Sequence, residues 1–106
     1  MIAHEWRART AGPEATERYR RVFETEVLDE LRAVAGFRGA YLLARPSGGA
    51  TEIRTLTLFD GDDAVRAFAG DAPGRERVSA AARAALVDSD PDVRRFEVLT
   101  AVPPVS

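Results

Sequence analysis

The sequence contains no cysteine, which excludes disulfide bonds, a zinc ribbon, an iron–sulfur centre and a cysteine nucleophile. It also contains no lysine, so neither a Schiff-base lysine nor a Walker-type phosphate loop is available. Asparagine and glutamine are absent as well. The single histidine, His4, excludes every metal site that needs several histidines, and we expect no metal site. The composition therefore excludes more chemistry than it indicates.

The charges are balanced and scattered along the chain. Fifteen arginines face 17 acidic residues, for a formal net charge of −2. A nucleic-acid-binding protein needs a basic surplus or a basic stripe, so we expect no nucleic-acid partner. No apolar run approaches the roughly 20 residues that span a bilayer, and the first nine residues lack the apolar core of a signal peptide. We therefore expect a cytoplasmic protein with no membrane partner.

The N-terminal half begins with an alternating segment and continues with a helical one. A period of two predicts a strand over Ile2–Thr10, with His4 and Trp6 on the same side. Pro13 suits the first turn of a helix, which we expect to run from Pro13 to Ala35 and to end at Gly36. Apolar residues at spacings of three and four give this helix one buried stripe. The stripe consists of Tyr19, Val22, Phe23, Val27, Leu31 and Val34.

The C-terminal half completes one ferredoxin-like domain. The Pro-Ser-Gly-Gly segment over residues 46–49 predicts a hairpin loop, and an aspartate over residues 60–62 can cap the next helix. The order β-α-β-β-α-β predicts an α+β fold with one antiparallel four-stranded sheet over residues 1–101, followed by a tail over 102–106. The further elements are expected as strands over 38–45 and 52–59, helices over 63–69 and 75–87, and a strand over 93–101.

Two of these strands are apolar on both sides. On the first strand, Tyr41 and Leu43 lie on one side and apolar residues lie on the other. On the second strand, Leu56 and Leu58 lie on one side, and Phe59 lies on the other. The two main helices can cover only one face of the sheet, while a water-facing side should be polar. We therefore predict a homodimer in which two sheets face each other, forming a dimeric α+β barrel. An incompletely filled space in such an assembly is a pocket for a small molecule.

Five segments carry a resemblance to a known family over nearly the whole chain. The chain resembles the antibiotic biosynthesis monooxygenase superfamily, the dimeric α+β barrels. The resemblance implies a homodimer with a cavity between helices and sheet or inside the barrel. For some members it also implies oxidation of aromatic polyketide intermediates without metal or flavin. The segments are His4–Arg7, Gly36–Leu43, Leu56–Asp60, Ala64–Gly70 and Val93–Val98.

The sequence departs from this family at positions that carry its chemistry. Phe59 stands where quinone-forming members have a tryptophan, and Thr55 or a neighbour stands in the place of their asparagine. The haem-degrading branch also depends on an asparagine, which this chain lacks. Residues 77–82 replace a tyrosine-rich segment, and Arg95 replaces a histidine. Arg83 matches an arginine that contacts the substrate in the quinone-forming branch. The resemblance therefore predicts the fold better than the reaction.

His4 and Trp6 are the first candidate site residues. His4 is the only side chain whose ordinary pKa lies near neutrality, which makes it the candidate general base. The alternative is a histidine that is partly exposed or bonded to the backbone near the chain start. Trp6 can stack on a flat ligand, or it can pack as a core residue beneath the helices.

Three further candidates are polar groups that could hold a ligand oxygen. Arg95 could stabilise an enolate or phenolate, or it could form an ordinary ion pair with Glu97. Arg83 could reach the cavity or remain a solvated helix residue. Tyr41 could donate its hydroxyl to a ligand, or it could fill the dimer interface.

The remaining candidates lie on one strand. Thr55, Thr57 and Phe59 share a side, and together they suit the half-polar wall of a cavity, although the same residue types are ordinary in strands. The aspartates over residues 60–63 are explained by helix capping more economically than by a cation site.

These residues lead to two classes of function. The first is a small cofactor-independent monooxygenase-like enzyme that deprotonates an aromatic, polyketide-type or enolisable substrate with His4 and lets the carbanion react with dioxygen. The same groups without oxygen chemistry would make a cyclase or isomerase. The second class is a dimeric ligand-binding or accessory protein without catalysis.

Overall fold

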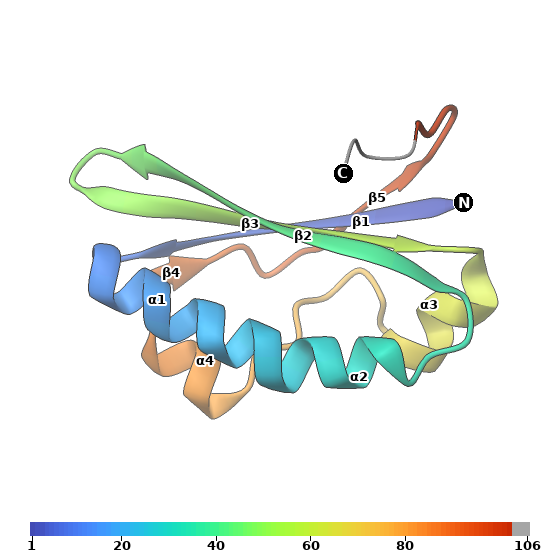
Figure 1. Ribbon diagram of the computed structural model, residues 1–106, viewed down its shortest axis with the longest axis horizontal. Helices are drawn as coiled ribbons and strands as arrows, with labels where there is room; N and C mark the ends of the chain where they lie inside the picture. The colour runs from blue at the N-terminus through green and yellow to red at the C-terminus, as the bar shows by residue number, and fades with distance from the viewer. Residues whose placement is uncertain (103–106) are drawn as a thin grey trace.

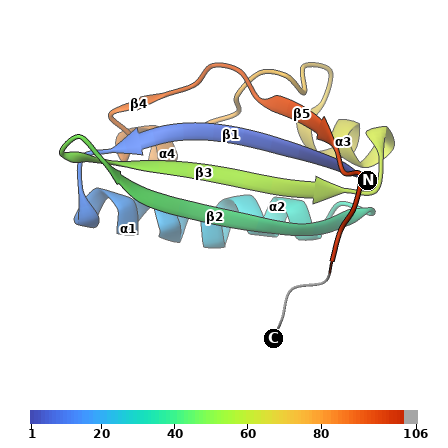
Figure 2. The same ribbon diagram turned by 90° about the horizontal axis from the view of Figure 1, so that it is seen from above.

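Strand β1 (Ile2–Thr10) lies inside a five-stranded antiparallel sheet in the computed structural model, which describes residues 1–102. One of its edges pairs with β3 (Ala50–Phe59), which pairs in turn with the edge strand β2 (Phe37–Ser47). The other edge pairs with the short strands β4 (Asp88–Ser89) and β5 (Arg94–Glu97) (Figure 2). The predicted ferredoxin-like α+β fold is confirmed.

All helices cover the same face of the sheet (Figure 1). The long helix predicted from Pro13 is present as three consecutive segments, α1 (Pro13–Val22), η1 (Phe23–Val27) and α2 (Leu28–Arg32). Segment η1 is a π-helical turn, in which the Leu28 N–H bonds to the Phe23 carbonyl five residues earlier. Such turns widen a helix locally and occur often at functional sites. The helix α3 (Asp62–Ala69) lies near one end of the sheet, and α4 (Ala80–Ala84) lies beside α1.

Glycines define the two tightest connections. Gly48 and Gly49 form the hairpin between β2 and β3, with φ values of 54° and 84°. Two positive φ values are typical of the turns whose twist matches paired strands. Gly36 follows the long helix with φ 91°, and a Cβ there would lie 2.9 Å from the Ala64 Cβ. The hairpin was predicted from the sequence and is confirmed. The long helix was predicted to run to Ala35 but ends at Arg32, and Gly36 has the predicted positive φ in the turn that follows.

Three local predictions for the second half are wrong. Only α4 is helical within residues 75–87, because residues 74–76 instead pair with residues 91–93 through Glu76 N–H to Pro91 O and Val93 N–H to Gly74 O. The strand predicted over 93–101 is short and is preceded by β4. The N-cap of α3 is Gly61, with no side-chain cap. The neighbouring aspartates form ion pairs instead, Asp60 with Arg38 and Asp62 with Arg95.

The core lies between the sheet and the helices in two adjoining clusters. One surrounds Trp6, Tyr19 and Ile53, and the other surrounds Leu31 and Phe59. Ile53, Leu31 and Phe59 have no exposed surface. Such burial is the main favourable contribution to folding. The predicted apolar stripe of the long helix therefore faces the sheet as expected.

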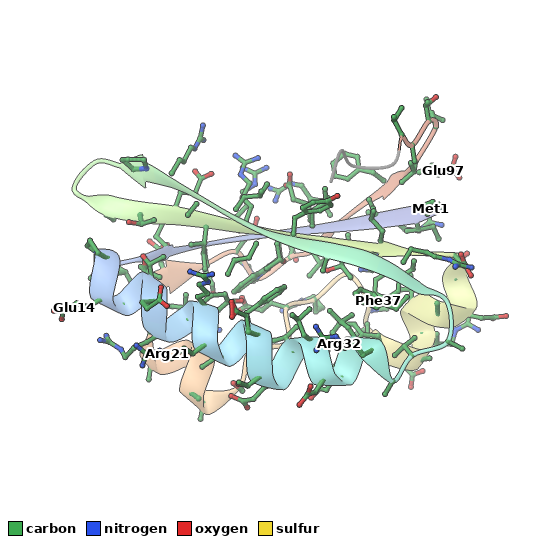
Figure 3. All side chains as sticks on the ribbon, viewed as in Figure 1. Met1, Glu14, Arg21, Arg32, Phe37 and Glu97 are labelled. Carbon is green, nitrogen blue, oxygen red and sulfur yellow. The ribbon has the colours of Figure 1, made fainter. Side chains whose placement is uncertain are left out.

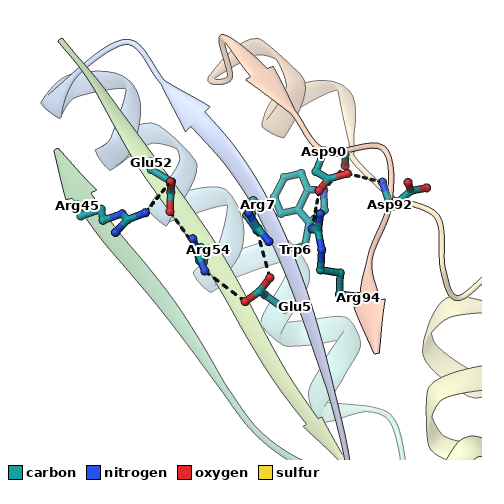
Figure 4. Close-up of polar contacts among 9 residues, drawn as sticks. All are labelled: Glu5, Trp6, Arg7, Arg45, Glu52, Arg54, Asp90, Asp92 and Arg94. Carbon is teal, nitrogen blue, oxygen red and sulfur yellow. Dashed lines mark hydrogen bonds and ion pairs between the residues drawn. The ribbon is translucent and has the colours of Figure 1, made fainter. Parts of the chain in front are cut away.

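The outer face of the sheet is divided into two halves, and among the described residues no helix covers it (Figures 1 and 3). One half is apolar, and there Tyr41, Leu43 and Phe96 are 43%, 49% and 50% exposed. The other half is charged, so the largely apolar character predicted for this side of two strands holds for only part of the face. Its ion pairs join Glu5 to Arg7 and Arg54, and Glu52 to Arg54 and Arg45 (Figure 4).

Among the described residues, no helix has the length and apolar character needed to cross a bilayer. The tail predicted over 102–106 lies outside the described residues except for Val102, which is exposed.

Candidate functional site

A cavity of about 470 Å³ lies between the helix-facing side of the sheet and the helices. Its volume falls within the range of about 300–1,000 Å³ that is typical of small-molecule sites. The walls come from the sheet, from the long helix and from the segment that connects α3 to α4. The lining residues used below are His4, Trp6, Tyr19, Thr55, Thr57 and Phe59, with Glu30, Phe68, Arg75, Arg77 and Ser79 nearer the connecting segment.

The sheet wall brings together five of the predicted site residues. In the pairing of β1 with β3, His4 lies opposite Thr57 and Trp6 lies opposite Thr55, while Phe59 pairs with Ile2 at the strand end. Partners in register point to the same face, which explains why residues about 50 positions apart meet here. All five line the cavity.

The imidazole of His4 is buried, with only 8% of the residue exposed. Its ring meets the edge of Phe59 with centroids 5.7 Å apart and an angle of 72° between planes. Burial is the largest influence on the pKa of His4 and lowers it from the ordinary value, and the positive charge of Arg95 lowers it further, while Asp62 acts in the opposite direction. The imidazole is therefore neutral at neutral pH and can accept a proton.

The indole of Trp6 is held by hydrogen bonds at its polar edge. Its Nε1–H donates to the Asp90 carbonyl at 2.9 Å and to Glu76 Oε2 at 3.2 Å. Its ring lies 6.1 Å from the ring of Tyr19, between centroids. Trp6 therefore packs in the core, as one of its two alternatives predicted, and it also forms part of the cavity wall. Its stacking on a flat ligand stays a prediction.

Three of the predicted site residues lie outside this cavity. Arg95 shares the face of His4 but bonds to Asp62 at 3.1 Å, and Glu97 is not its partner. Arg83 donates to Glu76 at 2.8 Å and to the Ser89 hydroxyl at 2.7 Å. Tyr41 lies on the opposite face of the sheet, where its side chain is exposed. None of the three lines this cavity, because strand alternation and ion pairing direct their side chains elsewhere.

The helix wall contains groups that the sequence did not single out as functional. Tyr19 on α1 is 4% exposed, and Glu26 on η1 and Glu30 on α2 line the cavity as well. Tyr19 belongs to the apolar stripe, and helical spacing alone does not distinguish a core residue from a residue that lines a cavity. The π-helical turn gave no recognisable signal in the sequence.

Arg77 ties the connecting segment to both neighbouring helices. Its guanidinium lies 5.1 Å from the Phe68 ring centroid and donates to the Phe68 carbonyl. It also lies 3.8 Å from the Glu30 carboxylate. Cation–π and charged hydrogen bonds of this kind hold an irregular segment in place. Arg77 therefore closes one side of the cavity between α2 and α3.

Within residues 1–102, no cluster of three or more histidine, aspartate or glutamate side chains is arranged to hold a metal ion.

Comparison with known proteins relates this chain to monooxygenases through its structure. No protein-family model matches the sequence, and no curated protein matches it. Among solved structures, the fold is similar to that of a monooxygenase from the gene ActVA-Orf6 of Streptomyces coelicolor in complex with nanaomycin D. The TM-score is 0.63 and the identity 18%, over 98% of this chain and 92% of that one.

Two further solved structures share the fold. SnoaB, a cofactor-independent oxygenase from Streptomyces nogalater, has a TM-score of 0.60 and 18% identity over 97% of this chain and 98% of that one. A mutant of MhuD with two manganese protoporphyrin IX molecules bound per active site has a TM-score of 0.61 and 21% identity over 96% and 99% of the two chains. The resemblance to the antibiotic biosynthesis monooxygenase superfamily is therefore confirmed for the fold, and at these identities for the fold alone.

Proposed function

We propose that this protein is a small cofactor-independent monooxygenase-like enzyme that oxidises an aromatic, polyketide-type or otherwise enolisable substrate. The observation that carries the proposal is a buried imidazole in the wall of a cavity that several aromatic side chains also line. His4 acts as the base, while Trp6 and Phe59 hold a flat ring system and Thr55 and Thr57 supply hydroxyls. The similar folds of known monooxygenases support the general kind of reaction.

The proposed reaction converts a ring CH₂ group into a carbonyl with dioxygen as the oxidant. His4 accepts one proton from the CH₂ group, and the resulting carbanion transfers an electron to dioxygen. The two radicals combine, and the peroxide takes up a proton to give a C–OOH group. Loss of the second C–H proton and of hydroxide then leaves the carbonyl and one water molecule. Both electrons of each broken C–H bond pass to oxygen, so no cofactor is required.

The lowered pKa of His4 limits the substrates that this base can activate. A weakly basic imidazole transfers protons efficiently only from acidic groups. Simple ketones are too weakly acidic, whereas a CH₂ group flanked by aromatic rings and conjugated to a carbonyl gives a stabilised, delocalised anion. Anthrone has this arrangement and is a suitable test substrate.

The experiment is oxygen uptake with anthrone, followed by product analysis, for the natural protein and for His4→Phe. The phenylalanine keeps a ring against Phe59 but removes the base, so the rate should fall by about 10²–10⁴-fold. Val87→Ala, at an exposed position outside the cavity, should retain the natural rate. An unchanged rate in His4→Phe would eliminate His4 as the base. Rearrangement of an enolisable substrate without oxygen uptake would identify a cyclase or isomerase, and binding without any turnover would identify an accessory protein.

The proposal includes a homodimer assembled through the outer face of the sheet. Tyr41, Leu43 and Phe96 form an apolar surface there, and Ala3, Leu56 and Leu58 belong to the same face. Exposed apolar surface of this kind on a sheet typically marks an interface. The charged half of the face, with Glu5, Arg54 and Glu52, would form the polar rim.

A further inference from the structure

Tyr19 brings a phenol into the cavity from the helix layer. It lies on α1, and its ring packs against the Trp6 ring on the opposite wall, with centroids 6.1 Å apart. The residue is 4% exposed and lines the cavity. Its position was predicted from helical spacing as a core position, and a phenylalanine would satisfy that packing equally well. The hydroxyl therefore needs a separate explanation.

The Tyr19 hydroxyl has no hydrogen-bond partner among the described residues, yet it is not sealed in the core. Every fully enclosed side-chain nitrogen or oxygen in residues 1–102 has a partner. The hydroxyl is therefore in contact with open space, and the open space beside it is the cavity. A ligand that fills this space displaces the water that can bond to the hydroxyl. It must then accept that hydrogen bond itself, because leaving the hydroxyl unpaired costs about 1–3 kcal/mol.

The protonation of Tyr19 suits the role of a donor. Burial raises the pKa of its phenol above the ordinary value, so the hydroxyl keeps its proton throughout the physiological range. On the opposite wall, His4 and Thr57 line the cavity and are each 8% exposed. A molecule between the two layers thus meets a donor on the helix side and an acceptor on the sheet side.

Four other donors in or near the cavity already have partners. The Trp6 N–H bonds to Asp90 and Glu76, and Arg77 bonds to the Phe68 carbonyl. The two arginines predicted from the sequence to hold an anion, Arg83 and Arg95, are paired with Glu76 and Asp62. Arg75 and the hydroxyls of Thr55 and Thr57 line other walls of the cavity. Among the lining residues of the long helix, Tyr19 is the donor for an oxygen atom of the ligand.

We propose that Tyr19 binds the substrate by donating a hydrogen bond to a carbonyl oxygen of a flat polycyclic ring system, opposite the proton acceptor His4. This inference rests on the proposed function, because the same oxygen carries the negative charge when His4 removes a proton. A hydrogen bond to a charged oxygen is stronger than one to a neutral carbonyl, so Tyr19 also stabilises the enolate.

The test is a binding measurement that needs no turnover. Trp6 is the only tryptophan and lines the cavity, so its fluorescence reports on occupancy. Under anaerobic conditions, the protein is titrated with anthrone and with 9,10-dihydroanthracene, which has the same carbon skeleton without the oxygen. The natural protein should bind anthrone more tightly. Tyr19→Phe should bind anthrone about 3- to 10-fold more weakly, the usual effect of one neutral hydrogen bond, and should bind dihydroanthracene unchanged.

The chain offers a matched control, because it contains only two tyrosines. Tyr41→Phe makes the same chemical change on the outer face and should leave both dissociation constants unchanged. The proposal is overturned if Tyr19→Phe binds anthrone as the natural protein does. It is also overturned if the natural protein shows no preference for anthrone, including no binding of either compound, or if Tyr19→Phe weakens both compounds equally. A selective loss of anthrone binding supports Tyr19 even if oxygen uptake fails, so the two proposals can fail separately.

Discussion

Arg95 lies directly opposite His4 in the pairing of β5 with β1, and its guanidinium bonds to Asp62 at the start of α3. Beside the cavity, a neutral imidazole therefore lies next to a cation, and the cation lies next to an anion. After burial, Arg95 is the next cause of the lowered pKa of His4, and Asp62 opposes it. The basicity of the candidate base is thus lowered chiefly by burial, and an ion pair that links two distant parts of the chain adjusts it further.

The first prediction follows from the opposite signs of these two charges. Replacing Arg95 by Met removes the cation and leaves the Asp62 carboxylate unpaired, so the pKa of His4 should rise. Replacing Asp62 by Asn leaves Arg95 unopposed, so the pKa should fall further. Because His4 is the only histidine, a single imidazole signal in an NMR pH titration reports it directly. A shift in the same direction in both variants would contradict the electrostatic explanation.

Much of this arrangement could be predicted from the sequence, because alternation in a strand assigns a face. It placed His4 and Trp6 together on Ile2–Thr10, and it placed Thr55, Thr57 and Phe59 together on the neighbouring strand. The pairing of the two strands then brings both sets to one wall. The partner of Arg95 could not be predicted in this way, since Asp62 is 33 residues distant and belongs to another layer.

The less predictable parts of the fold are those that depend on tertiary contacts. The segment over residues 75–87 has a high helix propensity from its alanines, but backbone bonds from residues 74–76 to residues 91–93 compete with the first turns. Ser79 then caps the remaining helix, because its Oγ accepts the Ala82 N–H. The helix ends at Ala84, and three residues later the Val87 N–H bonds to the Arg9 carbonyl. Propensity is a weak signal where such contacts are available.

The second prediction concerns stability as a function of pH. The pKa of His4 is lower in the folded chain than its ordinary value of 6.5, so the unfolded chain binds more protons between these two pH values. The free energy of unfolding should therefore decrease as the pH falls from 6.5 towards the folded pKa. Paired carboxyls such as Asp88 change the free energy of unfolding only at lower pH, because the carboxyl has an ordinary pKa of 3.8 in the unfolded chain and a lower pKa in the folded one. The free energy of unfolding, measured in urea, should decrease less between pH 7 and pH 5 in His4→Phe than in the natural protein. Equal decreases in the two proteins would contradict the prediction.

The third prediction concerns the hydrogen bonds of Trp6. Trp6→Phe removes the donor to the Asp90 carbonyl and to Glu76, and it should reduce the free energy of unfolding by about 1–3 kcal/mol. Glu76→Gln keeps an oxygen that can accept the indole N–H, but it loses the partly exposed ion pair with Arg83. It should therefore reduce the free energy of unfolding by about 0–1 kcal/mol. Urea unfolding at pH 7 compares the two variants. A larger loss in Glu76→Gln would show that the carboxylate, rather than the indole bond, stabilises this wall.

The fourth prediction concerns Gly36 after the long helix. Its φ of 91° lies in a region that side chains rarely adopt, and an added Cβ would lie 2.9 Å from the Ala64 Cβ. Gly36→Ala should therefore destabilise the protein by about 1–3 kcal/mol, measured as the free energy of unfolding in urea. Gly74→Ala is the matched control, since a Cβ there has nothing within 4 Å, and its effect should lie within about 0.5 kcal/mol. Equal losses in the two variants would mean that Gly36 has no special conformational role.

The fifth prediction tests the proposed homodimer. At micromolar concentration the natural protein should sediment at about twice the 11.5 kDa of one chain. Leu43 is 49% exposed on the apolar half of the outer face, so Leu43→Glu should leave the fold intact while placing a charge in the proposed interface. Burying that charge without a partner is unfavourable, and the variant should sediment as a single chain.

The control for this experiment places the same charge elsewhere. Val87 is 59% exposed and lies at the exit of α4, away from the outer face of the sheet, so Val87→Glu should remain dimeric. A natural protein that sediments as one chain at micromolar concentration would contradict the dimer. It would leave the cavity in place, because the described cavity is lined by residues of a single chain. The catalytic proposal and the assembly proposal therefore depend on opposite faces of the same sheet, and each can be tested without the other.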